Sequence, residues 1–451
     1  MNCFIGLDIG TSAVKGALIS EKGDIIKVSW SSYSYYFDNN AKLLSPDEFL
    51  EACFKVIGEL AQAAGEGNRV AAICPCGASG NLILLGSDDK PITPIIGWQT
   101  RIPDGELDEF YTEEERDALY KKVGWRPGYG FPIAYLPSIR KHNPELYKKA
   151  KTVTMSIEYL NFELSGKWGI GHSMATPFYL VDQEKGCYNK ELLKKLEISE
   201  SQLPPILSKG TSIGPVKKEV AESLGLECDT QVVLGSFDHP SGATGAGVYK
   251  SGEMLLSCGT SWVEFFPVES RTFAISTGCL VDRFMLDGAP YCVMKSIASI
   301  SDKINSTRKY WFGEISHKEF DDFAEKSSLG CNGLRFYFTD EDKENGKGFE
   351  KHDIARAIIE SAALMLKENL AECEEKGLSV DKITIIGGIT NSSVCTKIIA
   401  ETLQRPISVI NGQDAGAVGA AMLAGIGTGQ FKNEQDAFSK MNFKEAIYLP
   451  D

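Results

Sequence analysis

The first candidate for chemistry is an acidic residue that ends an apolar run near the start of the chain. Its segment contains Asp8, Gly10, Thr11, Ser12 and Lys15. A turn of glycine, threonine and serine directs backbone N–H groups and hydroxyls toward one point, which suits a phosphate group. Asp8 offers an oxygen ligand to hydrated Mg²⁺, and Lys15 offers a positive charge to a phosphate. An ordinary hairpin turn is the alternative, because glycine and serine are common in turns.

The same layout occurs a second time in the later half of the chain. Apolar residues precede and follow Gly259, Thr260 and Ser261, as they do around the first turn in residues 4–19. Two equivalent strand–turn–strand segments indicate an internal duplication with a period near half the chain. We therefore expect two facing hairpins that hold one polyphosphate between duplicated domains. The G-x-x-x-x-G-K-[ST] pattern of a P-loop is absent from the sequence.

A second acidic residue, Asp238, ends the apolar segment that begins at Val232, and His239-Pro240 follows it at a predicted helix start. An acid at that position can accept a proton from a substrate hydroxyl. Phosphoryl transfer otherwise requires mainly positioning and charge neutralisation. Asp238 could equally cap the helix, which is a common role for aspartate. The sequence leaves both interpretations open.

A glycine pair, Gly387 and Gly388, follows a buried-strand pattern, and Asn391 and Ser392 come shortly after it. Glycine without a side chain lets a flat ring approach the backbone, and the two polar residues can form hydrogen bonds with that ring. A tight strand-to-helix turn explains the same residues, and for this segment alone that reading is favoured.

The residues Trp98, Gln99 and Arg101 also follow an apolar run. An aromatic face beside hydrogen-bonding groups could line a pocket for a polyol. An edge strand with a surface arginine is the alternative, and it is favoured when this segment is considered alone.

The elements around these residues predict an α/β protein. Apolar runs predict strands near 4–8, 14–20, 25–30, 70–74, 232–238 and 382–386. Ser45 and Pro46 predict the start of a helix that runs to Ala64. Further helices are expected at 354–373, where the pattern is amphipathic, and at 414–429, where small residues permit close backbone packing.

Length and charge limit the classes of protein that fit. With 451 residues, the chain is too long for one hydrophobic core, so two or more domains are expected. A net charge of −14 disfavours nucleic acid and anionic membranes as partners. The twelve cysteines are scattered, no apolar run approaches the roughly 20 residues that cross a bilayer, and the N-terminus has no signal-peptide pattern. We expect reduced cysteines and a cytoplasmic location.

Together these segments resemble the FGGY family of carbohydrate kinases. The resemblance lies in 6–15, 98–101, 235–247, 259–261 and 387–388, which occur in the order typical of that family. It implies two duplicated actin-like, RNase H-like ATPase domains, at 1–245 and 246–451, with a catalytic cleft between them. It also implies ATP and Mg²⁺ as cofactors, a sugar or polyol as substrate, and a homodimer.

The same resemblance implies a role for each candidate residue. Asp238 would be the general base and Asp8 would position Mg²⁺. The phosphate-binding residues would be Gly10, Thr11, Ser12, Lys15, Gly259, Thr260 and Ser261. Residues near the adenosine would be Gly387, Gly388, Asn391 and Ser392. Residues facing the sugar would be Ser79, Trp98, Gln99, Arg101 and Asp238 itself.

The chain departs from the family pattern near the expected sugar site. Cys76-Gly-Ala-Ser79-Gly80 stands where some members carry Gln-Met-His-Gly, and no Gly-Glu-Arg element occurs between Phe338 and His352. A ketose such as a pentulose or hexulose is the expected acceptor. The alternatives are an actin-like switch that binds nucleotide without catalysis, and a kinase homologue that has lost activity.

Overall fold

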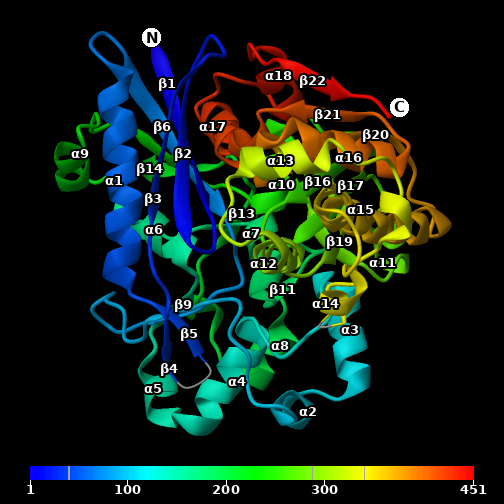
Figure 1. Ribbon diagram of the computed structural model, residues 1–451. Coiled ribbons are helices and arrows are strands. Elements are labelled where there is room, and N and C mark those ends of the chain that lie inside the picture. Colours follow the sequence, from blue (N-terminus) through cyan, green and yellow to red (C-terminus); the bar gives the residue numbers. More distant parts are fainter. Residues whose placement is uncertain (39–40, 287, 340, 451) are drawn as a thin grey trace. The chain divides into compact units, whose positions relative to one another are not determined.

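The chain folds into two compact units (Figure 1), and the computed structural model describes residues 1–38, 41–286, 288–339 and 341–450. Unit 1 comprises Met1–Gly245, Ser270–Cys292 and Gly416–Asn442. Unit 2 comprises Ala246–Glu269, Val293–Ala415 and Phe443–Asp451. The domain bounds expected from the sequence, 1–245 and 246–451, place residues 270–292 and 416–442 in the second domain. In the structure these two segments belong to unit 1.

Unit 1 is built on a six-stranded sheet in the order β14-β15-β6-β1-β2-β3. Its centre is β1 (Asn2–Ile9), which pairs with β2 (Ala13–Ser20) antiparallel and with β6 (Arg69–Gly77) parallel. The remaining strands of this sheet are β3 (Ile25–Ser32), β14 (Ser212–Pro215) and β15 (Gln231–Val233). The interiors of β1, β2 and β6 are apolar and buried, as expected for strands covered on both faces.

Two helices cover the faces of this sheet. A Cβ on Gly16 of β2 would overlap Val56 and Leu60 of α1 (Pro46–Ala64). A Cβ on Gly6 of β1 would overlap the backbone of α17 (Ala415–Gly427). Helix α1 begins as predicted, because the Ser45 hydroxyl accepts the Glu48 N–H. The two glycines therefore let both helices approach the strands that end at the first Gly-Thr-Ser turn.

The other elements of unit 1 lie around this core. Its shorter strands are β4 (Tyr36–Asp38), β5 (Ala41–Leu44), β7 (Ile83–Leu85), β8 (Ile95–Ile96), β9 (Thr152–Thr154), β10 (Ile170–Gly171), β11 (Val181–Asp182), β12 (Cys187–Tyr188), β13 (Ile206–Leu207) and β18 (Leu280–Arg283). Its other helices are α2 (Glu106–Phe110), α3 (Glu113–Val123), α4 (Pro132–His142), α5 (Pro144–Lys149), α6 (Ser156–Ser165), α7 (His172–Phe178), α8 (Lys190–Leu196), α9 (Lys218–Leu224), α10 (Asp238–Gly245), α11 (Arg271–Ser276) and α18 (Glu434–Ser439).

Unit 2 repeats the central arrangement of unit 1. Strand β16 (Gly252–Cys258) pairs with β17 (Trp262–Val268) antiparallel and with β20 (Val380–Gly387) parallel. In both units the strand before the turn ends opposite a glycine of its parallel neighbour, Gly77 or Gly387. Both glycines have positive φ, and a Cβ on either would strike the carbonyl of that strand end. The predicted duplication is thus visible down to single backbone contacts.

Strands and helices flank this core of unit 2. The strands follow in the order β19-β17-β16-β20-β21-β22. Their bounds are β19 (Tyr291–Ile297), β21 (Ile407–Ile410) and β22 (Glu445–Tyr448). The helices are α12 (Ile300–Phe312), α13 (His317–Ala324), α14 (Asp342–Asn345), α15 (Lys351–Glu375) and α16 (Ser393–Leu403).

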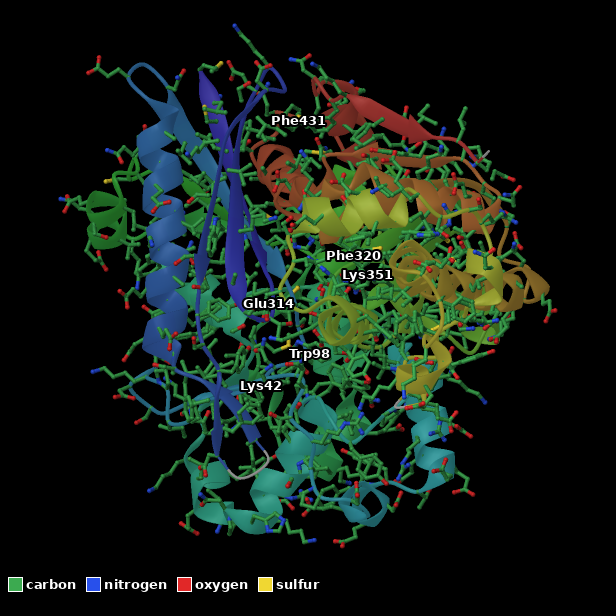
Figure 2. The ribbon with its side chains drawn as sticks, in the orientation of Figure 1. Lys42, Trp98, Glu314, Phe320, Lys351 and Phe431 are labelled. Carbon is green, nitrogen blue, oxygen red and sulfur yellow. The ribbon has the colours of Figure 1, made fainter. Side chains whose placement is uncertain are left out.

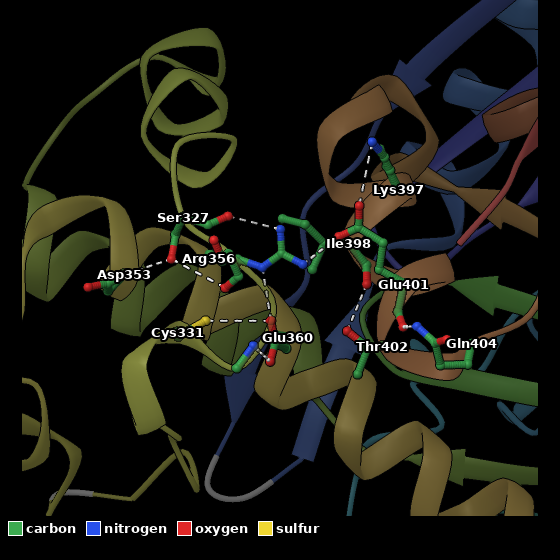
Figure 3. Close-up of polar contacts among 12 residues, drawn as sticks. Ser327, Cys331, Asp353, Arg356, Glu360, Lys397, Ile398, Glu401, Thr402 and Gln404 are labelled. Atoms are coloured by element: carbon green, nitrogen blue, oxygen red, sulfur yellow. Dashed lines mark hydrogen bonds and ion pairs between the residues drawn. The ribbon is translucent and has the colours of Figure 1, made fainter. Parts of the chain in front are cut away.

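A buried arginine ties the helices of unit 2 together (Figure 3). Arg356 of α15 donates to Glu360 over 2.9 Å and forms an ion pair with Glu401 of α16. It also donates to the carbonyl of Ser327, 3.2 Å away, in the turn that follows α13. Arg356 is 5% exposed, Glu360 5% and Glu401 7%. Arg356 thus pairs with both carboxylates, and Lys397 Nζ lies 3.5 Å from Glu401 Oε1. Each buried charge therefore has an opposite partner, which is the condition under which a buried charge is tolerated.

Candidate active site

The first Gly-Thr-Ser turn is fixed by contacts from three sides. The Gly10 N–H donates to the Ala13 carbonyl over 2.9 Å and closes the turn. The Tyr33 hydroxyl donates to the Gly10 carbonyl, and Trp98 Nε1 donates to Thr11 Oγ1 over 3.2 Å. Because Trp98 uses the Thr11 oxygen as an acceptor, the Thr11 O–H proton can point to a ligand. Sequence reasoning gave no role to Tyr33.

The buried carboxylate of Asp8 is affected by the Asp238 carboxylate within unit 1. Burial is the main cause that raises the pKa of Asp8 to about 7, and the Asp238 carboxylate acts in the same direction. Lys15, which lies opposite Asp8 in the β1–β2 register, lowers that pKa. Gly416 at the start of α17 lies against the Asp8 carboxylate and has no room for a Cβ. Asp8 is thus a crowded anion that lacks full compensation.

This pair of carboxylates fits a hard divalent cation. A cation beside Asp8 would relieve both its burial and its repulsion from Asp238. The described residues contain no cluster of three or more His, Cys, Asp or Glu that could hold a metal. Mg²⁺ does not need such a cluster, because it keeps several waters and binds through one or two carboxylates together with phosphate oxygens. The residues present therefore fit Mg²⁺.

Asp238 is the first residue of α10, and its side chain is 29% exposed. Its Oδ1 accepts the N–H of His239 over 2.7 Å. The carboxylate thus has a local partner, but that bond goes to the next residue and not to the N–H two or three residues further on that an N-cap side chain accepts. It also stays open enough to reach a ligand, as the catalytic interpretation requires.

A row of aromatic rings leads from Trp98 to the residue before Asp238. Trp98 stacks on Phe131 with ring centroids 6.4 Å apart, and Phe131 packs edge-on against Trp125 at 5.7 Å. Trp125 in turn packs against Phe237 at 5.6 Å. Phe131 adopts a φ of 70°, which is strained for a phenylalanine and requires firm surrounding contacts. Aromatic faces of this kind suit the C–H faces of a sugar.

The other residues predicted to face the sugar have different environments. Figure 2 labels Trp98 and Lys42, and the Lys42 ammonium donates to Gln99 Oε1. Arg101 is exposed, and no carboxylate among the described residues forms an ion pair with it. Ser79 is 3% exposed, and its hydroxyl lies 3.1 Å from Met155 Sδ and 3.3 Å from the Met174 carbonyl oxygen.

A tyrosine fixes the loop that carries Trp98. The Tyr135 hydroxyl lies 3.1 Å from the Gly97 carbonyl oxygen and 2.9 Å from that of Thr100. It therefore holds both ends of the loop. A cavity of about 10 Å³, the size of a single water, lies beside Trp98 and Thr11. Its polar lining also includes Tyr33, Tyr35, Asn81 and Ser156.

The second Gly-Thr-Ser turn is fixed by the N-terminal residues of α12. Ser301 Oγ donates to the Gly259 carbonyl over 2.6 Å, and its N–H donates to the Thr260 carbonyl over 3.1 Å. The Ser299 N–H donates to Ser261 Oγ, also over 3.1 Å. Gly259 and Thr260 themselves are exposed. The turn is thus rigid and open at its tip, which suits a backbone site for an anion.

The Gly387–Ser392 segment has features of both structures expected for it, a glycine pair open to a ligand and a strand-to-helix turn. Gly388 has open space where a Cβ would be, so a ligand could approach its backbone. The Ser392 hydroxyl accepts the Cys395 N–H over 3.0 Å and caps α16, as the strand-to-helix alternative predicts. Asn391 is exposed at the end of the short helix between them.

A larger cavity of about 380 Å³ lies along α12 in unit 2. It is lined by Lys303, Ser306, Thr307, Tyr310, Trp311, Phe338, Thr339, Asp342 and Lys343. The Asp342 carboxylate accepts the backbone N–H groups of Tyr337 and Thr339, each 3.0 Å away, and so shapes one wall. The cavity begins two residues beyond Ser301, which holds the second turn. No local sequence pattern marks it.

The fold and these sites define a class of protein, the two-domain kinases of the actin-like ATPase fold. Residues 3–245 match the N-terminal domain of the FGGY family of carbohydrate kinases, and residues 331–428 match its C-terminal domain. The chain therefore belongs to the FGGY family of carbohydrate kinases, enzymes that transfer a phosphoryl group. The predicted family, fold class and enzyme class are confirmed.

Individual relatives are distant but cover the whole chain. A xylulose kinase from Staphylococcus epidermidis is 24% identical over 99% of this chain and 92% of its own. The structure of a xylulose kinase from Lactobacillus acidophilus has a TM-score of 0.87 at 23% identity, and covers 100% of this chain and 94% of its own. A gluconate kinase from the same organism has a TM-score of 0.86 at 22% identity, with the same coverage. These two structures establish the fold.

Among the described residues, no helix combines the length and the apolar composition that a membrane crossing needs.

Proposed function

We propose that this kinase phosphorylates a hydroxyl of a sugar or polyol with ATP, and that Asp238 is the general base. The observation that carries the proposal is the position of Asp238 in unit 1. Its partly exposed carboxylate follows the row of aromatic rings that starts at Trp98, and its charge helps to raise the pKa of the crowded Asp8. One side of Asp238 is suited to an acceptor, and the other is suited to a phosphate with its cation.

The proposed reaction uses these groups in order. Asp238 accepts the proton of the acceptor hydroxyl as its oxygen attacks the terminal phosphorus of ATP. The bond from that phosphorus to the bridging oxygen breaks, and ADP leaves. Asp8 would hold Mg²⁺ through its waters, and the ion would neutralise phosphate charge. The two Gly-Thr-Ser turns, one in each unit, would bind phosphates through N–H groups and hydroxyls, with Lys15 adding a positive charge.

The acceptor is proposed at the level of a class. A ketose such as a pentulose is supported by the xylulose kinases among the relatives. A gluconate kinase and an autoinducer-2 kinase are also similar to this chain, so the family accommodates other acceptors. Trp98, Gln99, Arg101 and Ser79 are the residues proposed to face the acceptor, and Gly387, Gly388, Asn391 and Ser392 to face adenosine. A cytoplasmic location and a homodimer also stay predictions.

An ADP-release assay over a panel of ketoses, aldonates and polyols tests the proposal. At least one acceptor should give turnover that depends on Mg-ATP. Asp238→Asn should then lower kcat by about 10²–10⁴-fold, because a general base is lost. Thermal shifts with ATP and with acceptor should confirm that the variant still binds both. Full turnover in Asp238→Asn would refute the role of the base, and a response to nucleotide alone would favour a non-catalytic switch.

A further inference from the structure

One buried hydroxyl holds the N–H of Phe237, the residue before Asp238. The Phe237 N–H donates to Ser173 Oγ over 3.1 Å. Ser173 lies on α7 and is 1% exposed. Its own O–H donates to Asp282 Oδ2 over 2.8 Å. A chain of hydrogen bonds therefore runs from Asp282 through Ser173 to the Ser236–Phe237 peptide, one peptide bond before the one that joins the proposed base.

Asp282 fixes the direction of this chain. A serine hydroxyl can rotate, and it can donate or accept. Asp282 Oδ2 accepts the Ser173 O–H, which leaves a Ser173 lone pair for the Phe237 N–H. Asp282 is fully buried, and its other oxygen accepts the Arg283 N–H over 2.7 Å. Buried polar groups with all partners in place hold a single geometry.

The residues just before Phe237 are anchored by a different element. The Ser236 N–H donates to Cys76 Sγ over 3.3 Å, and the Gly77 N–H donates to the Ser236 carbonyl over 3.4 Å. Both of these contacts come from β6. The contact to Phe237 comes instead from α7, with Asp282 of β18 behind it. The two anchors can therefore be removed separately.

We propose that Ser173 and Asp282 are positioning residues that set the direction of the Asp238 carboxylate. This inference rests on the proposed role of Asp238 as the base. Loss of the Ser173 oxygen leaves the Phe237 N–H without its partner while the Ser236 carbonyl of the same peptide stays bonded to Gly77, so this peptide can tilt and shift the Asp238 carboxylate relative to the acceptor hydroxyl. A displacement of about 1 Å at a reacting group can cost about 10²-fold in rate.

Ser173→Ala in the full-length enzyme is the first test, measured with Mg-ATP and the best acceptor from the panel. We expect kcat to fall by about 10- to 100-fold, with KM for both substrates changed by less than about threefold. Ser236→Ala is the matched control. It removes an equally buried hydroxyl one residue from Phe237, and that hydroxyl contacts only the Cys76 sulfur, 4.0 Å away, among the described side chains. Its kcat should change by less than about threefold.

Asp282 provides a second pair of variants, which remains informative if Ser173→Ala fails to fold. Asp282→Asn keeps an oxygen that accepts the Ser173 proton, so most of the activity should remain. Asp282→Leu has a similar size but no acceptor, and its kcat should fall as in Ser173→Ala. Equal kcat values for the two Asp282 variants would overturn the inference, as would equal losses in Ser173→Ala and Ser236→Ala.

A double-mutant cycle separates this inference from the proposed function. If Ser173 acts through Asp238, Ser173→Ala should have little further effect on the residual turnover of Asp238→Asn. If the two losses multiply, the positioning role is wrong although Asp238 remains the base. Full activity in the single variant Asp238→Asn would instead refute the role of Asp238 as general base. The positioning role of Ser173 and Asp282 would then also be refuted, because it rests on that role.

Discussion

The two Gly-Thr-Ser turns share sequence and strand pairing, yet only the first has an aspartate and a lysine paired directly behind it. In unit 1, Asp8 and Lys15 face each other just behind the turn. The corresponding register position in unit 2 is occupied by Ser257 and Val263. The supports differ too, because side chains of Tyr33 and Trp98 hold the first turn and the N-terminus of α12 holds the second. The duplication therefore gives two similar turns, of which the first is the one proposed to act with a cation.

A similar contrast separates two sets of buried acids. In unit 2, Glu360 and Glu401 share the Arg356 cation. In unit 1, Glu158 is 1% exposed, and its Oε2 has no hydrogen-bond partner among the described residues. The first set is compensated by pairing, whereas Glu158 is easier to bury in protonated form. The two sets should therefore respond differently to mutation and to pH.

The largest expected effect is on the paired charges of unit 2. Arg356→Met leaves the buried Glu360 without a cation and Glu401 with Lys397 alone, and should lower the free energy of unfolding by about 3–5 kcal/mol. Denaturant unfolding measures this change. Lys382→Met is the control in the same unit, since its ion pair with Glu445 is exposed to solvent and should contribute at most about 1 kcal/mol. Equal losses in the two variants would contradict the role assigned to the buried cluster.

The buried acid of unit 1 should make stability depend on pH. Burial raises the pKa of Glu158 to about 8, from about 4.3 in the unfolded chain. Between these values the folded state keeps a proton that the unfolded state releases. Stability therefore falls as pH rises, by up to about 1.4 kcal/mol per pH unit. Glu158→Gln should flatten this slope and exceed the wild type in stability above pH 8, as measured by urea unfolding from pH 5 to pH 9.

The turns themselves can be compared by removing the polar residue behind each. Asp8→Asn should lower activity about 10- to 100-fold, because a group that orients cation-bound water is lost. Part of this loss should be recovered at high Mg²⁺ concentration. Ser257→Ala, at the corresponding place in unit 2, should change kcat/KM by less than about threefold. A larger loss of activity in Ser257→Ala than in Asp8→Asn would contradict the proposal that the cation binds beside the turn of unit 1.

Local patterns were enough to predict much of the fold. Ser45 and Pro46 predicted the start of α1, and the repeated Gly-Thr-Ser segment predicted the duplication that Gly77 and Gly387 now show in detail. These features depend on neighbours in sequence, so a single sequence reveals them.

Long-range contacts explain what sequence reasoning missed. Ser173 forms a hydrogen bond with Asp282, which is 109 residues away in the sequence, and no sequence pattern around either residue predicts that bond. Residues 270–292 belong to unit 1 although the chain has already entered unit 2 before them. Their place in unit 1 likewise depends on tertiary hydrogen bonds, such as those from Arg271 to the carbonyls of Lys121 and Lys122. The cavity along α12 arises between a helix and a later loop, so no spacing rule predicts it.

The smallest expected effect concerns how each turn is held. Trp98→Phe keeps an aromatic ring against Phe131 but removes the N–H that donates to Thr11, a bond of about 0.5–1.5 kcal/mol. Trp262→Phe is its counterpart in unit 2, because Trp262 Nε1 donates to Ser301 Oγ over 3.2 Å. Both should raise KM for ATP by a few-fold. Only Trp98→Phe should also raise KM for the acceptor, because only Trp98 belongs to the aromatic row that leads to Asp238. Steady-state kinetics, with ATP and the acceptor varied in turn, measure both KM values for each variant. An equal rise in acceptor KM for Trp262→Phe would contradict the claim that only the first turn is linked to the acceptor site.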